Sequence, residues 1–599
     1  MRRRESLAAL GATALLPAAA SAQRAADGER TLRLAFDFAE TGFDPPRVSD
    51  QSSSLVIEHI FEAPLAYDPM ASPPKLVPQT LVRLPEPSPD QRRWLFTLQP
   101  GIFFADDPAF GGERRELVAE DYVYSVKRYY DPELRSEHLQ HYEGLKLLGL
   151  PELRARALKD KTPFDYDTPV AGIRAIDRYR FEVRLAEPAP RLPYVFANAG
   201  IAGAVAREVV QRYRADPQAH PVGTGPFRLL AWRRASQVVL ERNPGYREVR
   251  FEAEPPAGDV EYQALHQKLA GRRLPLVDRI EINVIDESQP RWLAFLGGQL
   301  DALRLPEDMV PMAMPGGRLA PFLARRGVRA RRVEMPAIGH TFFNFDDPLV
   351  GGYGPTQVAL RRAIALAYDN ALENRHVYGG ALQVAQTMIP PHCFGYDPTV
   401  RSELGSGDVP RARALLDLAG YADRNRDGWR ETPSGEPIVL RRAFSPDQRS
   451  RRQAELWQRR MALIGLRLEP EFAPFGELIR RALSGQLMMW GFSWSAMAPD
   501  ADFFLGLAYS RHVDQSNDAR FRLPAFDALY ERQKQLADGP ERLALIRQAT
   551  RLMLAQVPYI PHHHSVAIEL SQPGVQGVIR HPFGRAWWRA AEIGSRQAM

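Results

Sequence analysis

Two strand patterns with a helix pattern between them, over residues 466–492, restrict the fold more than any other feature of the sequence. The first strand begins at 466–469, the helix pattern covers 475–483, and the second strand is the fully apolar run 487–492. Strands joined through a helix lie parallel in one sheet, and a strand without polar residues is buried on both faces. We therefore predict an α/β fold with a parallel sheet that is covered on both sides.

The same unit predicts where a ligand binds, because ligands of open α/β sheets bind outside the carboxyl ends of the strands. Most aromatic side chains in a stretch such as 490–504 belong to a core. Trp494 differs because it follows the strand and is flanked by two serines. We predict that Trp494 faces a ligand. The residues at this strand end are Gly491, Phe492, Ser493, Trp494 and Ser495.

Shorter patterns alternate between strand and helix along the rest of the chain. Alternating apolar residues predict strands at 31–36, 94–98, 180–185 and 277–285. Helix patterns cover 119–130, 359–368, 408–420 and 455–463. Asp408 is placed to cap the third helix, with Pro410 just inside it and Gly420 at its end. A chain of 599 residues exceeds the usual size of one domain, so we expect two or three lobes.

Composition is that of a globular protein, with 45% hydrophobic and 25% charged residues. A single cysteine, Cys393, excludes an internal disulfide and a cysteine-based zinc or iron–sulfur site. The net charge of +6 is small for this length, and the arginines are scattered among acidic residues. We therefore predict no nucleic-acid partner.

Residues 1–22 have the three-part layout of a cleaved secretory signal peptide. Arginines at 2–4 precede a short apolar run at 7–16, and small residues at 20–22 precede Gln23. The run is too short to span a bilayer; a buried N-terminal helix is the alternative. Two of the arginines also resemble a twin-arginine signal, so both the Sec and the twin-arginine routes stay open. We predict a periplasmic protein that begins near Gln23 and is not inserted in the membrane after cleavage.

The sequence has no short motif of a nucleotide-binding loop, a serine nucleophile elbow or a zinc-protease helix. Consecutive histidines at 562–564 alternate between two faces of a strand, so we interpret them as a polar strand end or cleft wall and not as a metal site. Asp423, Asn425 and Asp427 match the first half of a calcium loop, but Ser434 occupies the twelfth position, where that loop needs Glu. Glu431, at the ninth position of the loop, would supply the missing carboxylate ligand. Such residues also make turns, so we predict a turn and keep calcium as the alternative.

Several segments, in this order, resemble the large solute-binding proteins of ABC importers known as solute-binding family 5, which bind dipeptides, oligopeptides or nickel. The resemblance covers nearly all of the chain after residue 22. The strongest match is PVGTGPF at 221–227 followed by ERNPGY at 241–246, similar to the family's PVGTGPY and ERNPDY. Residues 119–128 resemble its AEDVVYSLKR helix, although Val118 replaces the usual capping Thr. Weaker matches lie at 98–104, 277–280, 297–301, 360–364, 389–391 and 394–398.

This resemblance implies a three-lobe periplasmic-binding-protein fold of type II (cluster C), in which two α/β lobes are joined by a hinge and an α+β lobe is inserted. Lobe I would comprise 23–64, 204–298 and 556–599, lobe II 65–203, and lobe III 299–555. The hinge between lobes I and III would close on the ligand. The strand end at 491–495 falls in lobe III, so the site predicted from the sheet coincides with the site that the resemblance implies.

One position departs from the family. In its peptide binders an Asp after this strand, within a pattern such as GWTGD, pairs with the peptide's α-amine. Aligned on Pro499, that position is Ser495. A buried ammonium without a carboxylate partner is costly. Asp500 or Asp502 is the acid nearby that would replace it; otherwise the ligand lacks a free amine. A peptide, a modified peptide and another mid-sized organic solute all stay open.

We predict a periplasmic solute-binding protein that captures a peptide or peptide-like solute between two lobes and delivers it to the permease subunits of an ABC importer in the inner membrane. We expect no enzyme activity, no cofactor and a monomer. The alternatives are an exported hydrolase or esterase, with a serine and a C-terminal histidine within hydrogen-bond reach, or a binding protein used for sensing. Arg361 either contacts ligand or braces a helix. The predicted ligand contacts are Trp494, Ser493, Ser495, Gly491, Phe492, Asn344, Arg361 and Asp500.

Overall fold

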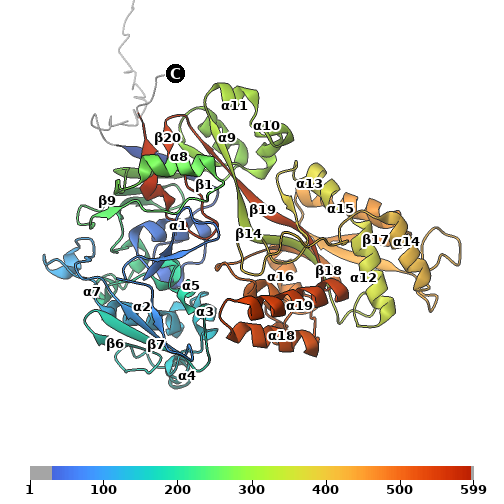
Figure 1. Ribbon diagram of the computed structural model, residues 1–599, viewed down its shortest axis with the longest axis horizontal. Coiled ribbons are helices and arrows are strands. Elements are labelled where there is room, and N and C mark those ends of the chain that lie inside the picture. Colours follow the sequence, from blue (N-terminus) through green and yellow to red (C-terminus); the bar gives the residue numbers. More distant parts are fainter. Residues whose placement is uncertain (1–29, 595–599) are drawn as a thin grey trace, which may run out of the picture.

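Two long antiparallel strands run between two groups of helices and sheets in the computed structural model, which describes residues 30–594 (Figure 1). β14 (Arg329–Phe343) and β19 (Tyr559–Ser571) pair along most of their length. Their register shifts between Glu334 and Ile338, which locally disrupts the hydrogen-bonded ladder. The predicted signal peptide at 1–22 lies outside the described residues.

The N-terminal part, formed by the residues before β13 and those after β19, holds two four-stranded sheets. One has the order β1 (Thr31–Phe36), β12 (Arg279–Val284), β9 (Gln237–Arg242), β8 (Phe227–Arg233), with β1 and β12 parallel. The other is antiparallel, with the order β4 (Glu86–Pro87), β5 (Arg93–Thr97), β7 (Arg180–Arg184), β6 (Ile173–Asp177). The four predicted strands are confirmed to within two residues at each end.

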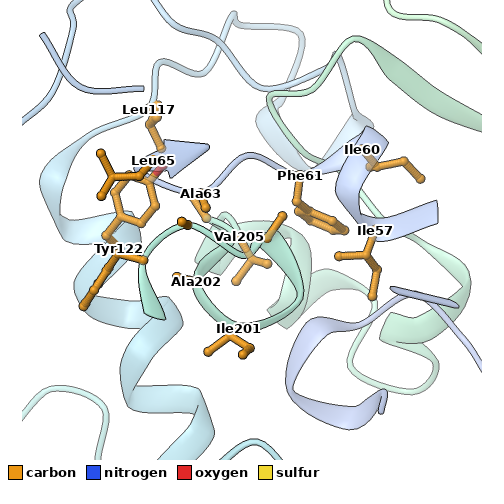
Figure 2. Close-up of a cluster of buried hydrophobic side chains, with 14 of the residues drawn as sticks. Ile57, Ile60, Phe61, Ala63, Leu65, Leu117, Tyr122, Ile201, Ala202 and Val205 are labelled. Atoms are coloured by element: carbon orange, nitrogen blue, oxygen red, sulfur yellow. The ribbon is translucent and has the colours of Figure 1, made fainter. Parts of the chain in front are cut away.

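α1 (Gln51–Ile60) and α2 (Ala119–Tyr130) lie in the core of this part (Figure 2). Ile57 and Ile60 of α1 and Tyr122 of α2 belong to the same buried cluster. The backbone N–H of Val118 donates to the Asp121 carboxylate, which satisfies one backbone group at a helix start that lacks a side-chain cap. The cluster also includes Trp587 and Trp588, so the last described residues help to close a core that begins at Leu32.

The C-terminal part is built on a seven-stranded sheet. Its main path is β13 (Ala302–Arg304), β19, β14, β18 (Met489–Ser495), β16 (Val439–Phe444), β17 (Arg467–Phe472), and β15 (Gln383–Val384) pairs with β19. α16 (Phe475–Leu483) joins β17 to β18, and both strands run parallel to β16, which lies between them. The β-α-β unit is therefore confirmed. The sheet as a whole is mixed and not parallel throughout, because β18 pairs antiparallel with β14.

Apolar side chains cover both faces of this sheet, as predicted. One face packs against α16, α17 (Asp502–Gly506), α18 (Pro524–Gln535) and α19 (Pro540–Gln556). The other packs against α12 (Pro355–Ala367), α14 (Val409–Leu418) and α15 (Gln448–Ala462). Figure 1 shows α18 and α19 below β18, on the side of the N-terminal part.

The predicted helices are all present. The Asp408 side chain accepts the Arg411 N–H and so caps α14, and α15 begins seven residues before the predicted start at 455. No helix among residues 30–594 has the length and apolar character needed to cross a bilayer. The remaining helices are α3 (Leu139–Glu143), α4 (Leu150–Asp160), α5 (Leu192–Val195), α6 (Ala199–Ala202), α7 (Arg207–Arg212), α8 (Val260–Leu269), α9 (Ser288–Leu296), α10 (Val310–Ala313), α11 (Pro321–Arg325) and α13 (Asn370–Val377).

Candidate ligand-binding site

The last residues of β18 have a neighbouring strand on one side only. Within the described chain, β18 pairs with β16 at Met489 and Trp490, whereas its pairing with β14 continues to Ser495. The backbone N–H of Ala496 donates to the Pro336 carbonyl and that of Asn344 to the Met488 carbonyl, so the even-numbered residues form the hydrogen-bonded pairs with β14.

The backbone groups of Ser493 and Ser495 consequently point to the side where β16 has already ended. Both serines are exposed, so solvent reaches this edge. An unpaired strand edge presents N–H and C=O groups to which an extended peptide can add as a further strand. We call these two residues the open edge of β18.

An aromatic row lies beside the open edge. Trp490, Phe492 and Trp494 share one face of β18, with ring centroids 4.5 Å and 5.3 Å apart between neighbours. The row continues to Phe475 of α16 at one end and Phe503 of α17 at the other. These two end members are 54% and 36% exposed, so the row is partly open to solvent. It suits apolar or aromatic groups of a ligand.

Gly491 is explained by packing. A Cβ at this position would lie 2.5 Å from the His340 carbonyl oxygen and 2.6 Å from Nη2 of Arg442. Because the neighbours leave no room for a side chain, only glycine fits here.

Behind Gly491 lies a buried polar network. Thr341 Oγ1 is 2.8 Å from His562 Nε2, and His562 Nδ1 is 2.7 Å from Asn370 Oδ1. Burial, together with the charge of Arg442, lowers the pKa of His562 well below its ordinary value. The spacing is that of a nucleophile, a base and an orienting group. Thr341, however, is 0% exposed, so a substrate does not reach its hydroxyl in this structure.

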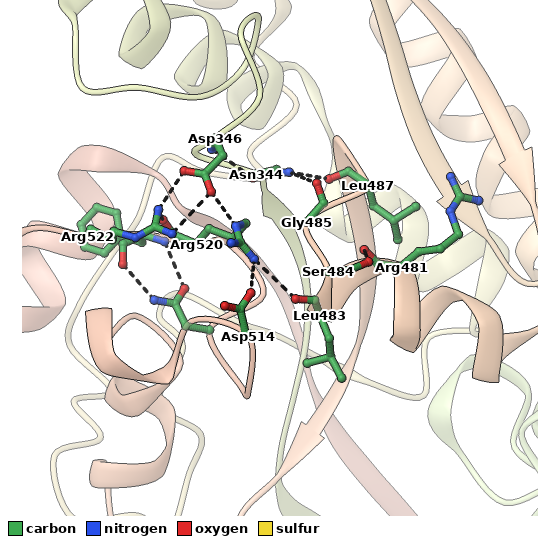
Figure 3. Close-up of polar contacts among 12 residues, drawn as sticks. Asn344, Asp346, Arg481, Leu483, Ser484, Gly485, Leu487, Asp514, Arg520 and Arg522 are labelled. Carbon is green, nitrogen blue, oxygen red and sulfur yellow. Dashed lines mark hydrogen bonds and ion pairs between the residues drawn. The ribbon is translucent and has the colours of Figure 1, made fainter.

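Two predicted contacts, Asn344 and Arg361, are buried and hold main-chain carbonyls. Asn344 Nδ2 donates to the carbonyls of Gly485 and Leu487 (Figure 3). Arg361 donates to carbonyls only, and burial lowers its pKa to about 10. These side chains brace the turn before β18 and the end of α19. The carbonyls that Arg361 holds belong to Val350, Gly352 and Gln556.

Asp500, which the sequence suggests as a partner for a ligand amine, is already paired with Arg542. It is buried and accepts hydrogen bonds from both terminal nitrogens of Arg542, at 2.5 Å and 2.7 Å. Asp502 accepts a hydrogen bond from Gln533 Nε2 at 2.8 Å. A ligand ammonium would have to displace Arg542 from Asp500, which is unfavourable for a desolvated two-point ion pair.

The carboxylate that approaches Trp494 is Asp518, which the sequence reasoning missed. The indole nitrogen of Trp494 lies 3.4 Å from Asp518 Oδ2. Burial raises the pKa of Asp518 to about 7. Asp518 follows Asn517, whose amide donates to the carbonyls of Tyr509 and Phe521 and so fixes the loop. This loop reaches β18 only in the folded chain, so no local sequence pattern indicates that Asp518 lies near Trp494.

The loop at 423–428 forms a turn in which backbone N–H groups of the loop donate hydrogen bonds to its acidic and amide side chains. The Asp423 carboxylate accepts the N–H groups of Asp427 and Gly428, and Asn425 Oδ1 accepts that of Asp427. Glu431 accepts the N–H of Arg424. Throughout residues 30–594, no group of three or more His, Cys, Asp or Glu side chains is placed to hold a metal ion.

A hollow lies where the N-terminal part meets β13 and β19. It is lined by β1, α1, β13 and β19, together with Arg580 and the two tryptophans of the core. Glu569 of β19 lines it and lies 3.5 Å from Nη1 of Arg580. Glu569 pairs with Arg331, before the register shift, whereas the open edge pairs with Ala337 and Gly339, within and after it.

Comparison with known proteins identifies the family. Residues 75–515 match the bacterial extracellular solute-binding proteins, family 5 middle. The chain belongs to this family. The di/tripeptide-binding protein 2 of Pseudomonas aeruginosa (strain UCBPP-PA14) is 27% identical over 95% of this chain and 96% of its own length. Heme-binding protein A of Haemophilus influenzae (strain Rd) is 25% identical over 83% of this chain and 81% of its own.

A solved structure agrees on the fold. The ABC transporter-associated periplasmic binding protein DppA of Helicobacter pylori, in complex with the peptide STSA, superposes with a TM-score of 0.68 over 94% of this chain and 98% of its own, at 18% identity. The type II multi-lobe fold and the resemblance to solute-binding family 5 are thus confirmed. These three relatives are all binding proteins and not enzymes by name.

Proposed function

We propose that this protein is the periplasmic solute-binding component of an ABC importer and that it captures a peptide or peptide-like organic solute. The observation that carries the proposal is the open edge of β18 beside the partly exposed aromatic row. Relatives named as a di/tripeptide-binding protein and as a peptide complex support it. The protein performs no chemistry on the solute, and its partners are the permease subunits in the inner membrane.

Capture begins when an extended ligand adds to β18. Its backbone N–H and C=O groups pair with those of Ser493 and Ser495, and alternate side chains of the ligand then face the aromatic row. Each such hydrogen bond contributes about 0.5–1.5 kcal/mol net, whatever the ligand's sequence. The aromatic rings add affinity for apolar groups of varied size. Recognition through the backbone suits a carrier of many related peptides.

Closure would follow by movement of the two parts about β14 and β19. The register shift between Glu334 and Ile338 is where these strands bend most readily, because a bulged ladder lacks regular hydrogen bonds. The permease would then distinguish the closed, liganded form from the open one. The two four-stranded sheets support lobe I (23–64, 204–298, 556–599) and lobe II (65–203) as separate units, and the seven-stranded sheet supports lobe III (299–555), except that β19 of this sheet falls within the bounds predicted for lobe I.

Binding measurements on two variants of one residue test the proposal. Ser493→Pro removes the backbone N–H that faces the open edge, whereas Ser493→Ala keeps it and removes only the hydroxyl. The full chain is unfolded to release bound solute, refolded, and titrated calorimetrically with peptides that mass spectrometry finds in the released fraction. We expect Ser493→Pro to weaken binding about 2- to 10-fold and Ser493→Ala to leave it unchanged.

Equal affinities of the two variants would contradict backbone capture at β18. Release of a planar macrocycle in place of peptides would contradict the ligand class, since a relative of similar identity is named for heme. Deletion of the gene distinguishes import from sensing. Loss of peptide uptake would support import, whereas a strain that still imports the peptide but no longer responds to it would identify a sensor.

A further inference from the structure

Asp518 is a buried carboxylate without a compensating cation. It is 4% exposed, and apart from its own backbone N–H its side chain has one hydrogen-bond partner, the indole N–H of Trp494 at 3.4 Å. Within residues 30–594, no Lys, Arg or His forms an ion pair with it. A carboxylate in such a place is costly to ionise unless a cation or several hydrogen bonds compensate it. The long indole contact supplies little of that compensation.

The arginines nearest to Asp518 in sequence are occupied elsewhere. Arg520 and Arg522 both pair with Asp346, at 2.5 Å and 2.8 Å, and Arg520 also pairs with Asp514 (Figure 3). These ion pairs lie at the turn before β18, where Arg520 also donates to the Leu483 carbonyl. Two basic residues within four positions therefore leave Asp518 uncompensated.

Asp500 provides a contrast within the same part of the fold. It is buried to the same degree as Asp518, but Arg542 neutralises it through two hydrogen bonds. Asp68 is also buried and has no cation in the part of the chain that the structure describes, but its carboxylate accepts three backbone N–H groups. Asp518, beside Trp494, has neither a cation nor several such donors among the described residues.

The surroundings of Asp518 suit an organic cation. The ring of Trp494 contacts those of Phe492 and Phe503, and Phe503 is partly exposed. Aromatic faces attract ammonium groups, and tryptophan does so most strongly. A charged amine attached to an apolar group would thus meet a carboxylate and an aromatic surface together. Ser495, at the end of the open edge, contributes no charge to this place.

We propose that Asp518 binds a primary ammonium group of the ligand, with the ring of Trp494 against the same group. The proposal rests on the proposed function and narrows its ligand to solutes that carry a free amine next to an apolar or aromatic group. The ammonium supplies the cation that the protein lacks, and the carboxylate comes from the loop at 513–523 and not from the end of β18.

A capture experiment with two peptide mixtures tests this. The probe is an equimolar mixture of di-, tri- and tetrapeptides made of Ala, Leu and Phe, whose only positive charge is the α-amine. The second mixture is the same with every α-amine acetylated. Emptied, refolded full-length protein is incubated with each, desalted and denatured, and the captured peptides are quantified by mass spectrometry. The variants are Asp518→Asn and, as a matched loss of one charge in the same loop, Asp514→Asn.

We expect the wild type to capture free-amine peptides at least about tenfold more than acetylated ones, because a charge-assisted contact is lost on acetylation. Capture of free-amine peptides by Asp518→Asn should fall by about the same factor. Asp514→Asn should capture them as the wild type does, because the Asp514 side chain is largely exposed and its ion pair with Arg520 contributes little. Thermal unfolding checks that the variants are folded.

Three outcomes separate the two proposals. Equal capture of both mixtures by the wild type, or undiminished capture by a folded Asp518→Asn, would overturn the role of Asp518 and leave the peptide-binding function standing. Capture of neither mixture by the wild type would overturn the proposed function and this inference with it.

Discussion

Asp500 and Arg542 form a buried ion pair, and replacing Arg542 should destabilise the protein more than replacing Asp500. Arg542 is 0% exposed and also bonds Asp538 and Gln533. Asp500→Asn therefore leaves the Arg542 guanidinium with other acceptors, and we expect the free energy of unfolding to fall by about 1.5–3 kcal/mol. Arg542→Met leaves the Asp500 carboxylate buried without its cation, which costs about 3–5 kcal/mol. The order of the two effects follows from which charge keeps a partner.

Urea unfolding followed by circular dichroism measures both losses. The double variant should be no less stable than Arg542→Met alone, because it removes the stranded charge. Arg547→Met is the control: Arg547 lies on the same helix and pairs with Asp397 at 3.2 Å, but it is half exposed, so we expect less than about 1 kcal/mol. The reasoning fails if Arg542→Met costs no more than Asp500→Asn, or if the double variant shows the sum of the single losses.

Three further predictions concern the site. Gly491→Ala should lower stability by about 1–3 kcal/mol because its Cβ meets the His340 carbonyl at 2.5 Å; an unchanged melting temperature would contradict the packing argument. Trp494→Ala should weaken peptide binding about 5- to 30-fold in calorimetry, and an unchanged Kd would remove Trp494 from the site. Asp518 titrates near pH 7 when folded and near 3.8 when unfolded, so the folded state retains a proton that the unfolded state loses. Between pH 5 and 7 the unfolding free energy of the unliganded wild type should therefore fall by about 2 kcal/mol relative to Asp518→Asn, and parallel urea-unfolding curves would refute this.

Elements whose signals are contained in a few neighbouring residues could be predicted from the sequence. The start of α14 is one case, because the Asp408 carboxylate accepts an N–H only three residues away. The strand β18 is another, because an apolar run after a helix predicts it, but it extends to Ser495 and not to residue 492 as predicted, so Trp494 lies within the strand and not after it. A local pattern does not show which strands are neighbours in a sheet. The position of β16 between β17 and β18 therefore could not be predicted.

Side-chain partners far apart in sequence were beyond prediction for the same reason. Arg361 holds the carbonyl of Gln556, and nothing near either residue indicates the other. Closeness to Ser495 in sequence makes Asp500 a candidate acid, but its carboxylate is paired with Arg542. Asp518 reaches Trp494 from a separate loop, and its missing counter-ion is visible only when every neighbour is placed.

The position of β19 also determines when folding can finish. β19 lies between β13 and β14 in the sheet, and the segment after it inserts Trp587 and Trp588 into the core that contains Leu32. A chain that emerges N-terminus first therefore carries an incomplete core and an unfilled strand position until its final residues arrive. Such distant pairings make folding slow. A chain that stops before residue 559 would lack one of the two long strands that run between the parts, and both the core around Leu32 and the sheet around β14 would stay incomplete.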